Sequence, residues 1–239
     1  MSSVRRTDQL ALTLEHAERF GREDFLEGPS NAAALALVER WPDWPDRIMV
    51  LVGPEGSGKS HLATVWAAAA GAKLVSAAAL AEAELPDLVT GALAVEDLAA
   101  GNFDERVLFH LINLARQHRA FVLLTARTPP AGWPFAVKDL ASRLRALPVV
   151  ALAPPDDALL RAVIVKLFAD RQIAVDESLV NYLTARIERS FAAARAAVVA
   201  LDREALRQQR PMTRALAVDL FRASDQLELF GQEQNTETP

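Results

Sequence analysis

A phosphate-binding pattern over residues 53–60 constrains the fold of this chain more than any other feature. Gly53, Gly58, Lys59 and Ser60 occupy the fixed positions of G-x-x-x-x-G-K-[ST]. A mainly apolar run over residues 47–52 precedes the pattern, and a helix-like stretch over residues 61–70 follows it. The alternative is a glycine turn that fits by chance. A strand before and a helix after weigh against it, because they are the context that a nucleotide-binding loop needs.

The residue types in this loop explain the chemistry. Glycines let the backbone turn its N–H groups toward phosphate oxygens, and the N-terminus of the following helix adds a partial positive charge. Lys59 can reach the β- and γ-phosphates, and the Ser60 hydroxyl can bind Mg²⁺. We therefore expect a nucleoside triphosphate or diphosphate, bound by Gly53, Pro54, Glu55, Gly56, Ser57, Gly58, Lys59 and Ser60.

The elements around the loop predict two domains. Strand patterns over residues 47–52, 73–76, 91–97, 121–125 and 147–152 alternate with helix patterns over residues 32–41, 61–70, 77–84, 104–118 and 137–145. This alternation predicts an α/β domain, a parallel sheet with helices on both faces. After Ala153 only helices are predicted, over residues 155–171, 177–187, 191–208 and 212–221. The expected division is an N-terminal arm (1–20), a nucleotide-binding domain (21–153), a helical lid (154–222) and a flexible tail (223–239).

Composition argues against several classes of function. With 26 Lys and Arg against 31 Asp and Glu, the net charge is −5, which argues against a large DNA-binding surface. The chain has no cysteine, and its four histidines are scattered without metal-ligand spacing. No stretch is long and apolar enough to span a membrane, and the N-terminus lacks an apolar signal core. We therefore expect a cytoplasmic protein that binds neither a membrane nor a specific DNA sequence.

A pair of acids follows the apolar residues 92–95. Glu96 and Asp97 would lie at the carboxyl end of a buried strand, where one acid can hold Mg²⁺ and the other can orient an attacking water. Alternatively, they simply begin a surface turn. Thr125 ends the next strand and could touch the γ-phosphate, although strands often end in threonine. The expected catalytic residues are Glu96, Asp97 and Thr125, and the expected Mg²⁺ ligands are Ser60 and Glu96.

Two arginines occupy positions that suit phosphate contacts. Arg143 lies in the helix pattern before the last strand and could reach the nucleotide of a neighbouring subunit. A trans-acting arginine of this kind neutralises transition-state charge. Arg189 opens a helix of the second domain and could touch phosphate across the interdomain cleft. From spacing alone, a solvated surface arginine is the simpler interpretation of both.

The combined pattern resembles the AAA+ family, and within it the DnaA group of bacterial replication initiators, over about residues 18–222. Residues 25–31 resemble the adenine-side motif of that group, 58–62 its phosphate-loop continuation, 140–144 its arginine-finger segment and 189–191 the start of its sensor II helix. The resemblance implies ADP or ATP with Mg²⁺, with nucleotide contacts from Phe25, Leu26, Asn31, His61 and Arg189. It also implies a sensor I role for Thr125, a finger role for Arg143 in catalysis, and the ability to form a homodimer.

Two departures from that family pattern bear on the ATPase activity and the DNA binding that we expect. Glu96 stands where the family usually has a metal-binding aspartate. A longer side chain changes the metal geometry, so we expect weak or no intrinsic ATPase activity. The initiators also carry a C-terminal helix-turn-helix domain that reads DNA, whereas this sequence continues after the expected lid with a short acidic tail. We therefore do not expect an origin-binding initiator.

With these departures, the sequence resembles shortened DnaA homologues of the Hda type, which bind the polymerase sliding clamp and provoke hydrolysis of the ATP held by DnaA. Two segments resemble clamp-binding peptides: Gln9, Leu10, Leu12 and Leu14 in the arm, and Gln226, Leu227, Leu229 and Phe230 in the tail. Alternatively, the first is an edge strand and the second packs on the last helix. The resemblance implies a negative regulator of replication initiation. The open alternative is an adaptor or loading factor that does not stimulate hydrolysis by the initiator.

Overall fold

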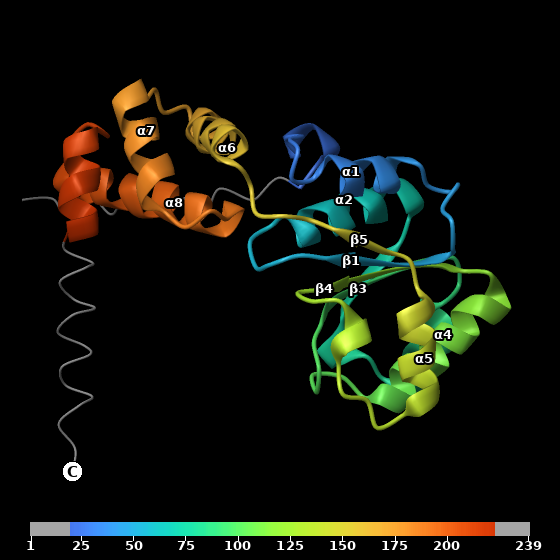
Figure 1. The fold of residues 1–239 in the computed structure, drawn as a ribbon. Helices are drawn as coiled ribbons and strands as arrows, with labels where there is room; N and C mark the ends of the chain where they lie inside the picture. Colours follow the sequence, from blue (N-terminus) through green and yellow to red (C-terminus); the bar gives the residue numbers. More distant parts are fainter. Residues whose placement is uncertain (1–19, 223–239) are drawn as a thin grey trace, which may run out of the picture.

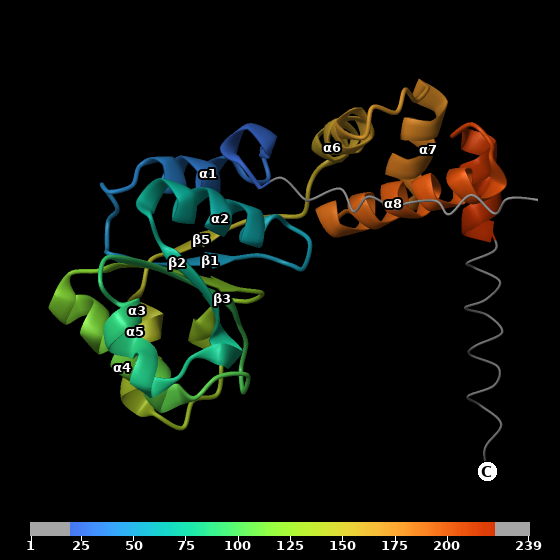
Figure 2. The ribbon, with the colours of Figure 1, turned by 180° about the vertical axis from the view of Figure 1, so that it is seen from behind.

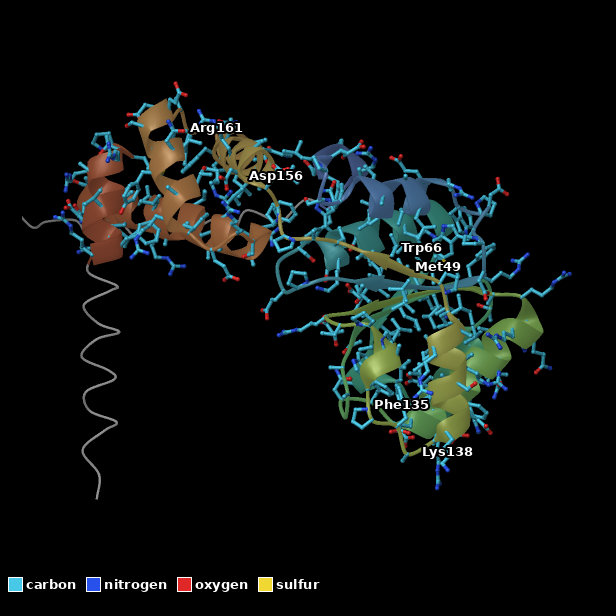
Figure 3. All side chains as sticks on the ribbon, in the orientation of Figure 1. Met49, Trp66, Phe135, Lys138, Asp156 and Arg161 are labelled. Carbon is cyan, nitrogen blue, oxygen red and sulfur yellow. The ribbon has the colours of Figure 1, made fainter. Side chains whose placement is uncertain are left out.

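The computed structural model describes residues 20–222, which form a part built on a sheet and a part built of helices (Figure 1, Figure 2). The chain passes from one to the other just after the last strand, where Ala153 N donates a hydrogen bond to Ser30 O at 3.0 Å. Asp156, labelled in Figure 3, lies at this passage. Within residues 20–222, no helix is both long and apolar enough to cross a membrane.

Five parallel strands form the sheet in the order β2-β3-β4-β1-β5. They are β1 (Ile48–Val52), β2 (Lys73–Ser76), β3 (Ala92–Leu98), β4 (Phe121–Ala126) and β5 (Val149–Ala151). β1 is buried along its whole length, as expected for a central strand of a parallel sheet whose two faces are both covered. All five predicted strands are confirmed. β5 begins later than predicted, after Pro148, which carries no backbone N–H for a ladder.

Alternate side chains of the strands enter two separate cores. Met49 and Leu51 of β1 pack with α1 (Ala32–Glu39) and α2 (Lys59–Ala70), whereas Ile48 and Val50 pack with α4 (Glu105–His118) and α5 (Lys138–Ala146). Figure 3 shows Met49 beside Trp66 of α2 on one side of the sheet. The predicted α/β fold, a parallel sheet with helices on both faces, is confirmed.

The segment between β2 and β3 differs from the prediction. One helix is predicted over residues 77–84, but the structure has two 3₁₀ helices, η2 (Ala77–Ala79) and η3 (Glu82–Glu84), with Leu80 and Ala81 extended between them. Extended backbone at these two residues interrupts the hydrogen bonds that one continuous α-helix would need. Pro86 lies in the first turn of α3 (Leu85–Leu88), where its missing N–H leaves no helical bond unmade.

Further helices make up the second part of the molecule. They are α6 (Asp157–Asp170), α7 (Glu177–Arg186), α8 (Phe191–Gln208) and a helical stretch over residues 214–222, and they confirm the four helices predicted there. The side chains of Asp156, Asp176 and Ser190 each accept a hydrogen bond from a backbone N–H in the first turn of the helix they precede. The apolar faces enclose a third core around Ile164 and Phe168. Two short 3₁₀ helices, η1 (Arg22–Asp24) and η4 (Pro130–Gly132), lie in loops of the first part.

Candidate nucleotide site

The phosphate loop connects β1 to α2 and follows a tight path through its neighbours. Gly56 and Gly58 have φ of +69° and +97°, a region that side-chain-bearing residues rarely adopt. Gly58 is also the N-cap of α2, so the loop leads directly into a helix N-terminus. A β-carbon at Gly53 would lie 2.6 Å from Leu152 O. The backbone N–H of Gly53 donates a hydrogen bond to Ala126 O at 3.1 Å. The glycines are therefore required by the path of the backbone.

Lys59 points into this loop. Its ammonium donates hydrogen bonds to Gly53 O and Pro54 O, both at 2.8 Å. Burial lowers the pKa of Lys59, the charge of Asp97 opposes that shift, and the charge of Arg127 adds to it. Carboxylates at Glu55 and Glu96 also favour the charged form. A strong local anion such as phosphate would favour the ammonium in the same way.

The acids at the end of β3 lie where the pairing between β3 and β4 becomes irregular. The pairing of β3 with β4 shifts between Val95 and Leu98, and Asp97 has a φ of +59°. Asp97 N donates to the hydroxyl of Thr125 at 3.0 Å, and Asp97 O accepts from Asn102 Nδ2 at 2.6 Å. Thr125 itself is buried. Asp97 and Thr125, both expected among the catalytic residues, are thus in direct contact, with the threonine hydroxyl holding the backbone of the acid.

Glu96 turns toward the phosphate loop. Burial raises its pKa, a hydrogen bond with the Ser60 side chain lowers it, and the charge of Asp97 raises it further. Its Oε1 atom is buried and has no hydrogen-bond partner among the described residues. A hydroxyl and a carboxylate oxygen are the hard ligands that Mg²⁺ prefers. Ser60 and Glu96 therefore fit a Mg²⁺ ion, which would supply the partner that Oε1 lacks.

A small pocket of about 90 Å³ lies at the other end of the loop, between the two parts of the molecule. Its apolar and glycine lining comes from Phe25, Leu26, Gly58, Val163, Leu167 and Phe191, and its polar lining from Asp24, His61, Lys166, Asp170 and Arg195. A pocket of this size holds a fragment of a ligand, such as a flat base, rather than a whole nucleotide. The residues predicted to contact the nucleotide include three that line this pocket, Phe25, Leu26 and His61.

His61 is fixed in its tautomer. Its Nε2 lies 2.9 Å from Gly21 O, which can only accept, so Nε2 carries the proton. Burial lowers the pKa of His61, and the ring packs edge-on against Phe25 at 5.1 Å between centroids.

Asn31, also predicted to contact nucleotide, shapes the loop before α1 in this structure. Its Oδ1 accepts from Gly28 N and its Nδ2 donates to Leu26 O, each at 2.9 Å.

The first turn of α8 lies directly on the phosphate loop. Phe191 N donates to Gly56 O at 2.8 Å, and a β-carbon at Gly56 would lie 2.8 Å from the β-carbon of Ser190. Ser190 is buried and caps the helix by accepting from Ala193 N at 3.0 Å. The positive end of this helix therefore faces the same loop as the N-terminus of α2.

The two predicted phosphate-contacting arginines lie elsewhere. Arg189 is 64% exposed and pairs with Asp157 Oδ1 at 2.9 Å, so a phosphate contact requires it to leave that carboxylate. Arg143 of α5 lies on the sheet face opposite α2, with its Cζ atom 4.9 Å from the centroid of the Phe109 ring. Their roles at phosphate stay predictions. The segments that resemble clamp-binding peptides, Gln9 to Leu14 and Gln226 to Phe230, lie outside the described residues.

Several residues at the site were not predicted. Arg127 pairs with Glu55 of the loop at 2.7 Å, and it could have been found because it follows Thr125 at the end of a predicted strand. Phe191, Lys166 and Arg195 line the pocket from helices of the second part. Phe191 belongs to the segment 189–191 that resembles the start of a sensor II helix, but its place at the pocket was not predicted. No local pattern marks Lys166 and Arg195, since only the docking of the helices brings them to the loop.

Comparison with known proteins establishes the fold. No protein-family model and no curated protein matches the chain. Among solved structures, domain III of the replication initiation protein DnaA of Thermotoga maritima is 17% identical, with a TM-score of 0.69 over 85% of this chain and 96% of that one. The RuvB Holliday junction branch migration motor of Thermotoga maritima is 14% identical, with a TM-score of 0.68 over 86% and 72%. AMPPCP-bound DnaA of Aquifex aeolicus is 17% identical, with a TM-score of 0.61 over 75% and 64%. The chain therefore has a DnaA-like AAA+ fold.

Proposed function

We propose that this chain binds an adenine nucleotide with Mg²⁺ and regulates replication initiation by promoting hydrolysis of the ATP held by the initiator DnaA. The observation that carries the proposal is the first turn of α8 seated on the phosphate loop, where Phe191 N meets Gly56 O, beside a pocket suited to a base. The neighbour from Aquifex aeolicus, a DnaA, was solved with AMPPCP, which supports an adenine nucleotide as the ligand.

Each part of the site has a task in this proposal. The backbone N–H groups of residues 53–60 hold the phosphates, and Lys59 leaves the carbonyls of Gly53 and Pro54 for the β- and γ-phosphates. Ser60 and Glu96 hold Mg²⁺, which neutralises phosphate charge when bound. Phe25, Leu26 and His61 face the base from the first part, and Phe191 faces it from the second.

The nucleotide acts mainly as a structural ligand. Glu96 stands where the family pattern usually has a metal-binding aspartate, and its longer side chain changes the geometry of the proposed Mg²⁺ site. Asp97 is the remaining acid at the end of β3, and its backbone is held by Thr125. Slow intrinsic hydrolysis follows, and the bound nucleotide then keeps the lid and the sheet in one arrangement.

Arg143 is the residue that we assign to the partner's nucleotide. It lies on α5, where its Cζ atom is 4.9 Å from the centroid of the Phe109 ring, a cation–π contact. Its guanidinium N–H donors have the geometry that phosphate oxygens accept. The peptides around Gln9 and Gln226 would bring the chain to the sliding clamp, where leucine and phenylalanine side chains can fill an apolar pocket.

The test is hydrolysis of ATP bound beforehand to the initiator, measured with and without this protein and DNA-loaded clamp. We expect faster hydrolysis only when both are added. Arg143→Ala should remove the acceleration while clamp binding is retained, because trans-acting arginines contribute about 10³–10⁵-fold in rate. Arg145→Ala, an exposed arginine on the same helix, is the matched control and should keep the acceleration.

Two results would overturn the regulatory role. Unchanged hydrolysis, with nucleotide and clamp both bound, would favour an adaptor that recruits another protein. Equal loss of activity in Arg143→Ala and Arg145→Ala would remove Arg143 from its assigned role.

A further inference from the structure

We propose that Arg127 is a phosphate-contacting residue that makes this site prefer a triphosphate over a diphosphate, with Glu55 as the acid that competes for it. The inference rests on the nucleotide binding proposed above. It assigns a residue and a direction of selectivity that neither the sequence motifs nor the structural neighbours supply.

Arg127 leaves the sheet beside the phosphate loop. It directly follows Ala126, the last residue of β4, and Ala126 O accepts a hydrogen bond from Gly53 N at 3.1 Å. β4 lies between β1, which leads into the loop, and β3, which ends in the acid pair. The order of the strands therefore places Arg127 beside the loop and next to the strand that carries Glu96 and Asp97.

The contacts of Arg127 show that it faces the loop. Its Nη2 atom lies 2.7 Å from Oε2 of Glu55, the third residue of the phosphate pattern. Arg127 also lies close enough to Lys59 to interact with it electrostatically. Two cations thus lie near the same loop, which is the arrangement expected where a multiply charged anion binds.

The position of the base pocket indicates which part of the nucleotide would contact Arg127. The base pocket is lined by Gly58, His61 and Phe191, and none of its described lining residues comes from β4 or the turn after it. Phosphates run from that pocket toward Lys59, which reaches the β- and γ-phosphates. Because the terminal phosphate is the farthest from the base, it arrives on the side of Arg127.

Glu55 explains why the contact would be selective. A carboxylate within a phosphate loop repels phosphate unless a cation neutralises it, and Arg127 does so here. The pair is exposed, with side-chain exposures of 64% for Arg127 and 72% for Glu55, so it adds little stability and exchanges readily. Only a ligand with enough charge at that end competes effectively for the guanidinium, and a triphosphate carries that charge whereas a diphosphate does not.

The experiment measures equilibrium affinities of the full chain for MgATP and MgADP. Arg127→Ala should weaken MgATP binding by about tenfold to a hundredfold, the range for loss of one charge-assisted hydrogen bond, and weaken MgADP binding much less. Glu55→Gln should tighten MgATP binding several-fold, on the order of the effect of removing one nearby like charge. In the Glu55→Gln background, Arg127→Ala should still weaken MgATP binding more than MgADP binding, because the guanidinium contacts the terminal phosphate and does not act only by neutralising Glu55. Arg116→Ala, an exposed arginine in the last turn of α4, serves as the control.

Each outcome decides the matter. Equal weakening of MgATP and MgADP in Arg127→Ala, or less than about twofold change for either, would overturn the inference while leaving nucleotide binding intact. Equal weakening of MgATP and MgADP by Arg127→Ala in the Glu55→Gln background would also overturn it. If the wild-type chain binds neither nucleotide, both this inference and the proposed function fail.

Discussion

At the scale of single residues, the chemistry of the site turns on Glu96. Its carboxyl is half-buried beside Ser60, with one oxygen that lacks a hydrogen-bond partner among the described residues. Burying a carboxylate is costly unless a cation or a donor compensates it. The charged form of Glu96 therefore destabilises the folded chain unless Mg²⁺ is bound. We expect Mg²⁺ to raise the free energy of unfolding.

Glu96→Gln should stabilise the chain at neutral pH in the absence of Mg²⁺. Burial raises the pKa of Glu96 above its ordinary value of 4.5, so wild-type stability falls as pH rises through that raised pKa, whereas glutamine does not titrate. A gain of about 1 kcal/mol would raise Tm by about 2–4 °C in a chain of this size. Thermal melts from pH 4 to pH 8 measure this gain. The difference in Tm between Glu96→Gln and the wild type should vanish at pH values below 4.5, the ordinary pKa of the carboxyl.

The surface residue Glu84 supplies the control for this prediction. Glu84→Gln should leave the melting curve unchanged at every pH. A Glu96→Gln variant that is less stable than wild type at neutral pH without Mg²⁺ would contradict the assigned environment of the carboxyl.

Sequence patterns located these residues but not their geometry. Glu96 and Asp97 were expected because acids follow an apolar strand, and Thr125 because it ends the next one. The bulge at Asp97 and its bond to Thr125 could not be predicted, because they depend on how β3 and β4 align, which is not a local property. Asn31 matched the expected motif but serves the fold of the loop before α1.

At the scale of elements, the contact between α8 and the phosphate loop organises the site. Gly56 O accepts from Phe191 N, and there is no room for a side chain between Gly56 and Ser190. The first turn of the helix and the loop thus form one surface. Displacing either should change the binding of nucleotide as well as the docking of the lid.

Gly56→Ala tests this contact, with Gly71→Ala as its matched control. Gly56 and Gly71 have similar φ values, +69° and +62°, but a β-carbon at Gly71 meets nothing within 4 Å. Both variants should lose about 1–2 kcal/mol of stability from the left-handed backbone. Only Gly56→Ala should also weaken nucleotide binding, by about tenfold or more if one hydrogen bond and its packing are lost. Equal nucleotide affinities in the two variants would show that the α8 contact is irrelevant to binding.

The individual elements were largely predictable, because helix and strand periodicity is local. The helix over residues 191–208 was predicted with the bounds that α8 has in the structure. The segment over residues 77–84 was predicted wrongly, because its alanine-rich composition favours a helix whereas its backbone is extended at Leu80 and Ala81. Where α8 docks could not be read from its own sequence, since an apolar face indicates only that something covers it.

At the scale of the whole molecule, a few contacts hold the helical part against the sheet (Figure 1). Besides the bond from Phe191 to Gly56, Lys166 of α6 donates to Asp24 Oδ1 at 2.6 Å, between residues 142 positions apart. Burial opposes the charge on Lys166, but its hydrogen bonds with Asp170 and Asp24 outweigh that effect and raise its pKa. Because these contacts lie around the base pocket, a bound nucleotide would add further contacts there and strengthen the association of the helical part with the part built on the sheet.

The central claim is that one nucleotide is held by the phosphate loop and the lid together, and hydrogen exchange tests it most directly. Backbone amide exchange should be measured for the full chain with and without MgATP, and for Lys59→Ala under both conditions. We predict that MgATP slows exchange in residues 53–60 and in residues 189–195 at the same nucleotide concentration, and that Lys59→Ala loses both effects. Protection of the phosphate loop with unchanged exchange at the start of α8, or protection that survives in Lys59→Ala, would contradict the account.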